Sequence, residues 1–100
     1  MPIKVALQAI DGKKREEVMG GGILDRILPM DDPRFAMLRY VDPYSNTIFN
    51  GLQMYPLIEE LDRLVEGVSD GEEKNILGEV RRLAIYCRDH PHWYLRFIGD

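Results

Sequence analysis

Alternating apolar residues near both ends of the chain predict a sheet with one buried face. In residues 3–10, apolar and polar side chains alternate along most of the segment. Residues 92–98 repeat the pattern, with Trp93, Leu95 and Phe97 on one side. Successive side chains of a strand point to opposite faces, so each segment reads as a half-buried strand. Parallel strands read instead as continuous apolar runs, so the alternation favours an antiparallel sheet.

The middle of the chain predicts a β-hairpin. Residues 35–41 and 47–50 are rich in aromatic and β-branched residues, and the polar segment DPYSN separates them. The side chain of Asp42 can cap a turn here, and Asn46 suits a left-handed exit from it. Tyr44 has no structural role in such a turn, so we expect it to contact a partner.

Apolar stripes with helical spacing predict two long helices, over about residues 53–66 and 70–89. Ser69 and Glu72 fit a capping box at the start of the second helix. A third, short helix is expected near residues 23–28, where apolar pairs recur four residues apart.

The segment of residues 13–19 is ambiguous between strand and helix. Asp11-Gly12 is a hairpin signal, which favours a returning strand. The segment is highly charged, as expected of an edge strand that avoids pairing with other chains.

Together these elements predict a single domain over residues 1–100. The strands and helices are largely segregated along the chain, which favours an α+β fold. We therefore expect two layers, with a mostly antiparallel sheet on one side and the two long helices packed against it.

Charge and composition disfavour several classes of partner. The formal net charge is −4, whereas a protein that wraps nucleic acid usually needs a basic face. No apolar run approaches the roughly 20 residues that span a bilayer. Cys87 is the only cysteine, so no disulfide can form within the chain. We expect a cytoplasmic protein that binds neither nucleic acid nor membrane.

Motifs that signal catalysis or metal binding are missing from the sequence. It contains no P-loop, no G-x-S-x-G and no H-E-x-x-H. The segment CRDHPHW, residues 87–93, combines Cys, Asp and His. A structural zinc site usually takes its ligands from two separate segments, and the sequence has no second cluster of such residues. We expect no metal and no cofactor. A binding protein is favoured over an enzyme, although missing motifs leave the question of catalysis open.

The leading functional hypothesis is a small acidic module that binds and regulates another protein. Glu59, Glu60, Asp62 and Glu66 are placed to form an acidic helix face, which together with Tyr44 would contact a partner with a basic surface. The alternative is an acidic helix face that is solvated and binds nothing. Immunity-type inhibitors are one class with this size and charge, and the likeness is one of class alone, without a shared motif.

The alternative hypothesis is a small enzyme or ligand-binding domain with a pocket between sheet and helices. His90, His92, Tyr94 and Arg96, close to the C-terminal strand, are the candidate ligand-binding residues. Cys87 completes the apolar stripe of its helix, so we expect a buried and unreactive thiol unless a histidine folds back over it.

Overall fold

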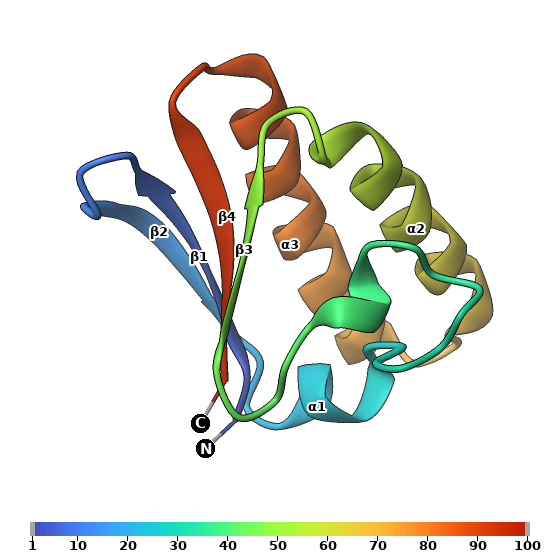
Figure 1. Cartoon of the computed structure of the whole chain (residues 1–100). Helices are drawn as coiled ribbons and strands as arrows, with labels where there is room; N and C mark the ends of the chain where they lie inside the picture. The colour runs from blue at the N-terminus through green and yellow to red at the C-terminus, as the bar shows by residue number, and fades with distance from the viewer. Residues whose placement is uncertain (1, 100) are drawn as a thin grey trace.

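In the computed structural model, which describes residues 2–99, two long helices cover one face of a four-stranded sheet (Figure 1). The α+β architecture expected from the sequence is confirmed. In chain order the elements are β1 (Lys4–Ala9), β2 (Lys14–Met19), α1 (Ile23–Ile27), the 3₁₀ turn η1 (Leu38–Tyr40), β3 (Asn46–Asn50), α2 (Met54–Gly67), α3 (Gly71–Asp89) and β4 (Trp93–Ile98).

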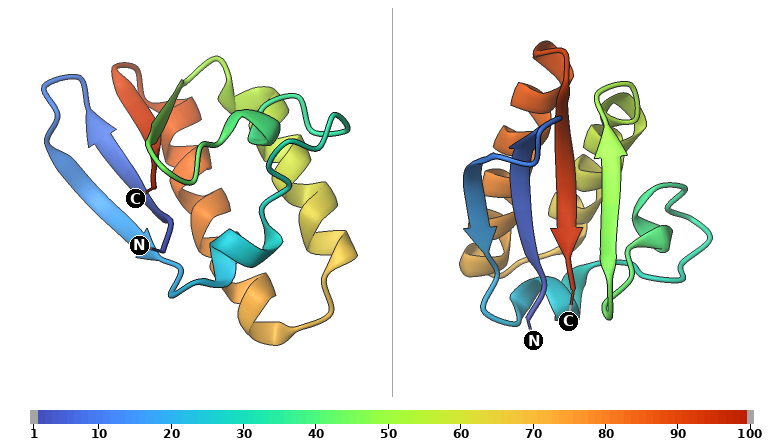
Figure 2. Two further views of the ribbon diagram at one scale, coloured as in Figure 1. Left: turned by 60° about the horizontal axis from the view of Figure 1, so that its bottom comes forward. Right: turned by 60° about the vertical axis from the view of Figure 1, so that its left-hand side comes forward.

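The sheet has the strand order β2-β1-β4-β3, and every neighbouring pair is antiparallel. The last strand therefore lies between β1 and β3, as the right-hand view of Figure 2 shows. Phe97 of β4 is opposite Val5 on one side and Thr47 on the other. The ambiguous segment of residues 13–19 forms the edge strand β2 rather than a helix.

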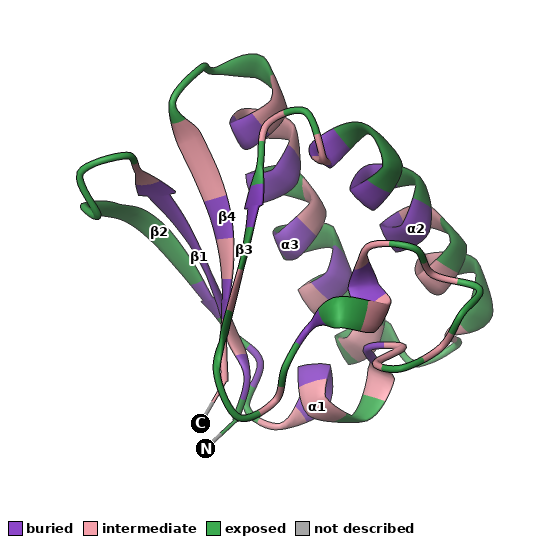
Figure 3. Ribbon diagram, viewed as in Figure 1, coloured by how far each residue is buried: buried purple, intermediate pink, exposed green. Residues whose placement is uncertain are grey.

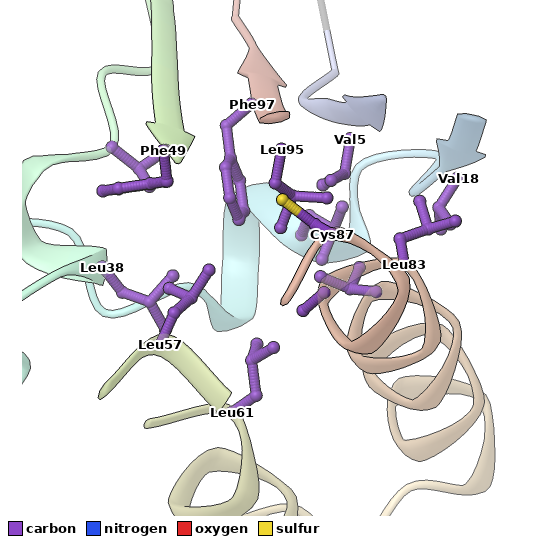
Figure 4. Packing of buried hydrophobic residues seen from close by; sticks show 14 of the residues in the cluster. Val5, Val18, Leu38, Phe49, Leu57, Leu61, Leu83, Cys87, Leu95 and Phe97 are labelled. Atoms are coloured by element: carbon purple, nitrogen blue, oxygen red, sulfur yellow. The ribbon is translucent and has the colours of Figure 1, made fainter. Parts of the chain in front are cut away.

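The hydrophobic core lies between the sheet and the helices (Figures 3 and 4). Phe49 and Phe97 meet edge to face, with their ring centroids 5.7 Å apart. Full burial of such a side chain stabilises the fold by about 1.5–3 kcal/mol. The buried inward side chains of the sheet are Val5, Leu7, Val18, Phe49, Leu95 and Phe97.

Side-chain hydrogen bonds stabilise the start of α3 and the turn before α2. Asp70 accepts hydrogen bonds from the backbone N–H groups of Glu72 and Glu73, so the cap of α3 is one residue later than the predicted Ser69. Asn50 and Gln53 exchange side-chain and backbone bonds before α2, in the manner of a capping box. No helix within residues 2–99 combines the length and apolarity needed to cross a bilayer.

The predicted strand over residues 35–41 is wrong. This segment contains η1, and β3 pairs with β4 instead of with it. The cause is the carboxylate of Glu60 on α2, which accepts hydrogen bonds from the N–H groups of Met37 and Leu38, both at 2.9 Å. A carboxylate that receives consecutive N–H groups stabilises the start of a helical turn. This contact spans 22 and 23 residues, so the local sequence pattern gives no sign of it.

The segment DPYSN forms a turn that joins η1 to β3. Asp42 caps it as predicted, because its Oδ1 accepts a hydrogen bond from the N–H of Tyr44 at 2.8 Å. Asn46 is the first residue of β3 and not a left-handed exit, since its φ is not among the positive values. Gly99, just after β4, packs directly on this turn and donates its N–H to the carbonyl of Ser45 at 2.8 Å.

Close packing at Gly99 generates a test with an internal control. A Cβ at Gly99 would lie 2.6 Å from the backbone of Pro43, whereas a Cβ at Gly78 would meet nothing within 4 Å. We expect Gly99→Ala to lower the free energy of unfolding by about 1–3 kcal/mol through overpacking. Gly78→Ala, inside α3, should raise it by about 0.5–1 kcal/mol. Urea unfolding of both variants measures this, and the same sign for both would contradict the packing described.

Candidate functional site

The outward face of α2 carries an exposed stripe that starts with an aromatic ring and continues with carboxylates. Tyr55, Glu59, Asp62 and Glu66 recur at helical spacing and therefore share one side of the helix. The side chain of Tyr55 is 59% exposed, and Glu59 and Glu66 are also exposed. We call these four residues the α2 stripe.

The charges of the α2 stripe are only partly neutralised. Asp62 accepts a hydrogen bond from Nε of Arg81 on α3 at 2.6 Å, which links the two helices. This pair is half-exposed, so it stabilises the fold by at most about 1 kcal/mol. Glu59 and Glu66 form no ion pair with any residue of the described chain. They are therefore the carboxylates that a partner can reach without breaking a contact.

Glu60 does not belong to this surface, although the sequence placed it there. Its side chain is only 2% exposed and points toward the loop before β3, where both oxygens accept backbone hydrogen bonds. Its predicted role in partner binding is therefore wrong for this structure. Glu60 is a structural residue.

The different roles of Glu59 and Glu60 can be separated by neighbouring substitutions. Glu60→Ala leaves two backbone N–H groups without their acceptor, and we expect it to lower the free energy of unfolding by about 2–5 kcal/mol. Glu59→Ala, on the exposed side of the same turn, should change it by less than about 0.5 kcal/mol. Denaturant titration of both variants measures the difference. Equal losses would show that the contact with η1 is unimportant.

Tyr44 lies apart from the α2 stripe. Its side chain is 79% exposed beside a shallow hollow of about 600 Å³ that is lined by Met30, Asp31 and residues 39–44. Tyr44 precedes β3, whereas α2 begins after it. Tyr44 and the start of α2 therefore lie at opposite ends of this strand. Of the predicted contact residues, the structure brings together Glu59, Asp62 and Glu66.

The alternative ligand-binding residues fall on two different faces. His90 and His92 line a hollow of about 370 Å³, together with Tyr55 and Arg88, where the β3–α2 and α3–β4 connections meet. Tyr94 and Arg96 alternate with the buried residues of β4 and lie on the uncovered face of the sheet. The Nη1 group of Arg96 is 3.3 Å from Oε1 of Gln8 on that face. One pocket cannot include all four residues.

Within the hollow, the histidines differ in how firmly they are held. His90 stacks on Tyr86 with ring centroids 3.8 Å apart, and its Nδ1 lies 2.9 Å from the carbonyl oxygen of Tyr86. His92 has a left-handed backbone with φ of 69°. Such a backbone is uncommon outside glycine, and here it turns the chain from α3 into β4. Arg88 is paired with Asp89 at 2.8 Å.

Cys87, which also borders this hollow, is not a nucleophile. Its side chain is fully buried, and its Sγ donates a hydrogen bond to the carbonyl of Trp93 at 3.3 Å. Burial raises the pKa of the Cys87 thiol to about 11, so the thiol stays protonated at neutral pH. Within residues 2–99, no three His, Cys, Asp or Glu side chains are grouped so that they could hold a metal ion.

Sequence reasoning missed a concentration of exposed apolar side chains around β3. Its signal was present at Tyr55, which lies off the apolar stripe of its helix, and at Leu52 just before that helix. Large hydrophobic side chains exposed in the described structure are Ile10, Met19, Tyr40, Tyr44, Ile48, Leu52 and Tyr55. Five of these seven lie within residues 40–55. Grouped exposed apolar residues of this kind commonly mark interaction surfaces.

Comparison with known proteins finds no family model that matches the chain, and no similar curated protein or solved structure.

Proposed function

We propose that this protein is a non-catalytic module that binds another protein through the α2 stripe. The observation that carries the proposal is the exposure of Tyr55 in line with the unpaired carboxylates of Glu59 and Glu66. The partner would present a basic surface. The single cysteine gives little support to an enzyme, because Cys87 is buried and its thiol is protonated at neutral pH.

The two kinds of residue in the stripe would have different tasks in binding. Tyrosine buries a large area for little loss of side-chain entropy, so Tyr55 is suited to be the anchor. Glu59 and Glu66 would attract a cationic partner and orient it during approach, which affects mainly the association rate and the choice of partner. Salt screens such exposed charges, so association should slow as ionic strength rises.

An immunity-type inhibitor is one kind of protein that fits this description. Such a protein would cover a basic functional surface of its target with an acidic helix face. Size, charge and the exposed stripe support this class.

The function is tested by comparing what the wild-type protein and a charge-reversed variant capture from the native host. Glu59→Lys combined with Glu66→Lys reverses both unpaired charges and leaves the ion pair between Asp62 and Arg81 intact. We expect the captured partner, identified by mass spectrometry and then purified, to bind the wild-type chain at least tenfold more tightly than the variant. Isothermal titration measures the affinities.

The matched control is Asp11→Lys combined with Glu72→Lys, which changes the net charge equally at exposed positions away from the α2 stripe. This control should bind the partner as the wild-type chain does. Equal weakening of both variants would indicate a general charge effect, and unchanged binding of the α2 variant would exclude the stripe as the contact surface.

The hollow beside His90 and His92 favours a second candidate function, the binding of a small molecule. Its volume of about 370 Å³ falls within the usual range for ligand pockets, and it combines aromatic rings with the cationic Arg88. This chemistry suits a small aromatic carboxylate. The proposed site would include His90 and His92 but neither Tyr94 nor Arg96.

Benzoate is a suitable probe of this second candidate. We expect a saturable rise in Tm with benzoate, because a ligand that binds only the folded state stabilises it. His92→Asn, which tolerates the left-handed backbone, should remove the rise, whereas Tyr94→Phe on the other face of the sheet should preserve it. No rise in the wild-type chain, or a rise that His92→Asn leaves intact, would count against the pocket.

A further inference from the structure

The outer edge of β3 presents backbone groups that the sheet does not use. The N–H of Gly99 donates to the carbonyl of Ser45, and the N–H of Asn50 points away from β4 to Oε1 of Gln53. Hydrogen-bonded and non-hydrogen-bonded pairs alternate along an antiparallel ladder. These two contacts therefore fix the pattern: residues 47 and 49 bond to β4, and residues 46, 48 and 50 direct their N–H and C=O groups outward.

Two of these three outward positions have no partner for their backbone groups in the described chain. Asn50 is occupied, because both its N–H and its C=O bond to Gln53. For Asn46 and Ile48, no hydrogen bond of the outward N–H or C=O is found within residues 2–99. The edge thus offers two donors and two acceptors, arranged alternately along a short extended segment.

The two edges of the sheet differ in how they resist pairing with another chain. The edge strand β2 has the sequence KREEVM, and its first four residues are charged and exposed. Charged residues of this kind normally prevent edge-to-edge association. The edge strand β3 has the sequence NTIFN, with no charged residue and no proline. The side chain of Ile48 at its centre is 53% exposed.

We propose that β3 pairs antiparallel with β3 of a second copy of this chain, about a two-fold axis at Thr47. In this register Asn46 of each copy lies opposite Ile48 of the other. Each of these opposed pairs exchanges two backbone hydrogen bonds, as in an antiparallel ladder. The four outward groups of one copy are then satisfied by the four of the other, and no donor or acceptor is left over. The proposal is independent of the α2 stripe and of its partner.

The exposed apolar residues at the two ends of β3 favour a second copy as the occupant. Tyr44, before the strand, and Leu52, after it, are the two most exposed large hydrophobic residues of the described chain, at 79% and 81%. Turns precede and follow β3, and they carry Tyr44 and Leu52 respectively. Antiparallel pairing places the start of β3 in each copy next to the end of β3 in the other, so the turn with Tyr44 of one copy and the turn with Leu52 of the other lie at the same end of the strand pair. A two-fold interface repeats this arrangement at both ends of the strand pair.

The available apolar area is of the size that a small interface needs. A tyrosine side chain buries about 150–250 Å² when it is covered. Tyr44 precedes the edge strand, Ile48 lies on it and Leu52 follows it, and all three are exposed. Together these residues can supply much of the roughly 800 Å² per partner of a standard interface. Strand pairing would set the register, and the flanking side chains would supply most of the buried surface.

Cysteine cross-linking between differently labelled chains tests the register. Tyr44→Cys and Leu52→Cys are made as separate variants and then mixed under mild oxidation. We expect a disulfide-linked dimer in the mixture, because residue 44 of one copy and residue 52 of the other lie at the same end of the strand pair. Each variant alone should form at least tenfold less, since the two copies of either residue lie at opposite ends of the strand pair. The buried Cys87 is not expected to react.

Met19→Cys, an exposed position on the β2 edge, is the matched control for this experiment. Mixed with Tyr44→Cys, it should cross-link no more than either variant alone. Equal cross-linking of the control mixture, or no cross-link between Tyr44→Cys and Leu52→Cys, would overturn the proposal.

Sedimentation equilibrium of the full chain tests the pairing itself. We expect a concentration-dependent dimer, and Ile48→Pro should raise its dissociation constant at least tenfold because proline removes one outward N–H and β4 does not use that group. Ile48→Thr keeps the N–H and should weaken the dimer less than Ile48→Pro does. A monomer at every concentration, or a dimer that Ile48→Pro leaves unchanged in a folded chain, would overturn the proposal.

Discussion

The buried carboxylate of Glu60 determines how the chain enters its third strand, and much of the surface depends on it. The carboxylate receives two backbone N–H groups of the loop before β3, and these charge-assisted bonds offset the cost of removing the charge from water. The loop then turns inward, so that Leu38 and Val41 join the core. The same turn brings the segment DPYSN to the end of β4, where Gly99 packs against it. A single side chain of α2 thus positions the loop that precedes the edge of the sheet.

The parts of the fold that sequence reasoning predicted depend on neighbours within a few residues. Alternation gave β1 and β4, and helical stripes gave α2 and α3, because one face of each element is buried continuously. The segment of residues 35–41 has the composition of a strand, yet a distant carboxylate holds it in a turn. Spacing alone also could not distinguish Glu60 from Glu59, since the outcome depends on which side of α2 the loop covers.

For the candidate sites, the sequence predicted on which side of a strand or helix a residue lies, but not how far its side chain is buried. The period of two in β4 already placed Tyr94 and Arg96 opposite Trp93, and the structure shows that they lie away from the hollow of His90 and His92. Exposure could not be obtained in this way. Leu52 and Ile48 have the composition of core residues, but the one precedes its helix and the other faces outward on an edge strand. Their exposure follows from the tertiary arrangement.

The central position of β4 has a consequence for how the chain acquires its fold during synthesis. The β1–β2 hairpin can form as soon as residue 19 is available, whereas β3 has no strand beside it until residues 93–98 have been made. Until then both edges of β3 remain without a neighbouring strand. Such intermediates are prone to aggregate, and pairings between distant segments are slow to form. The sheet is therefore expected to be completed only after translation of this domain has ended.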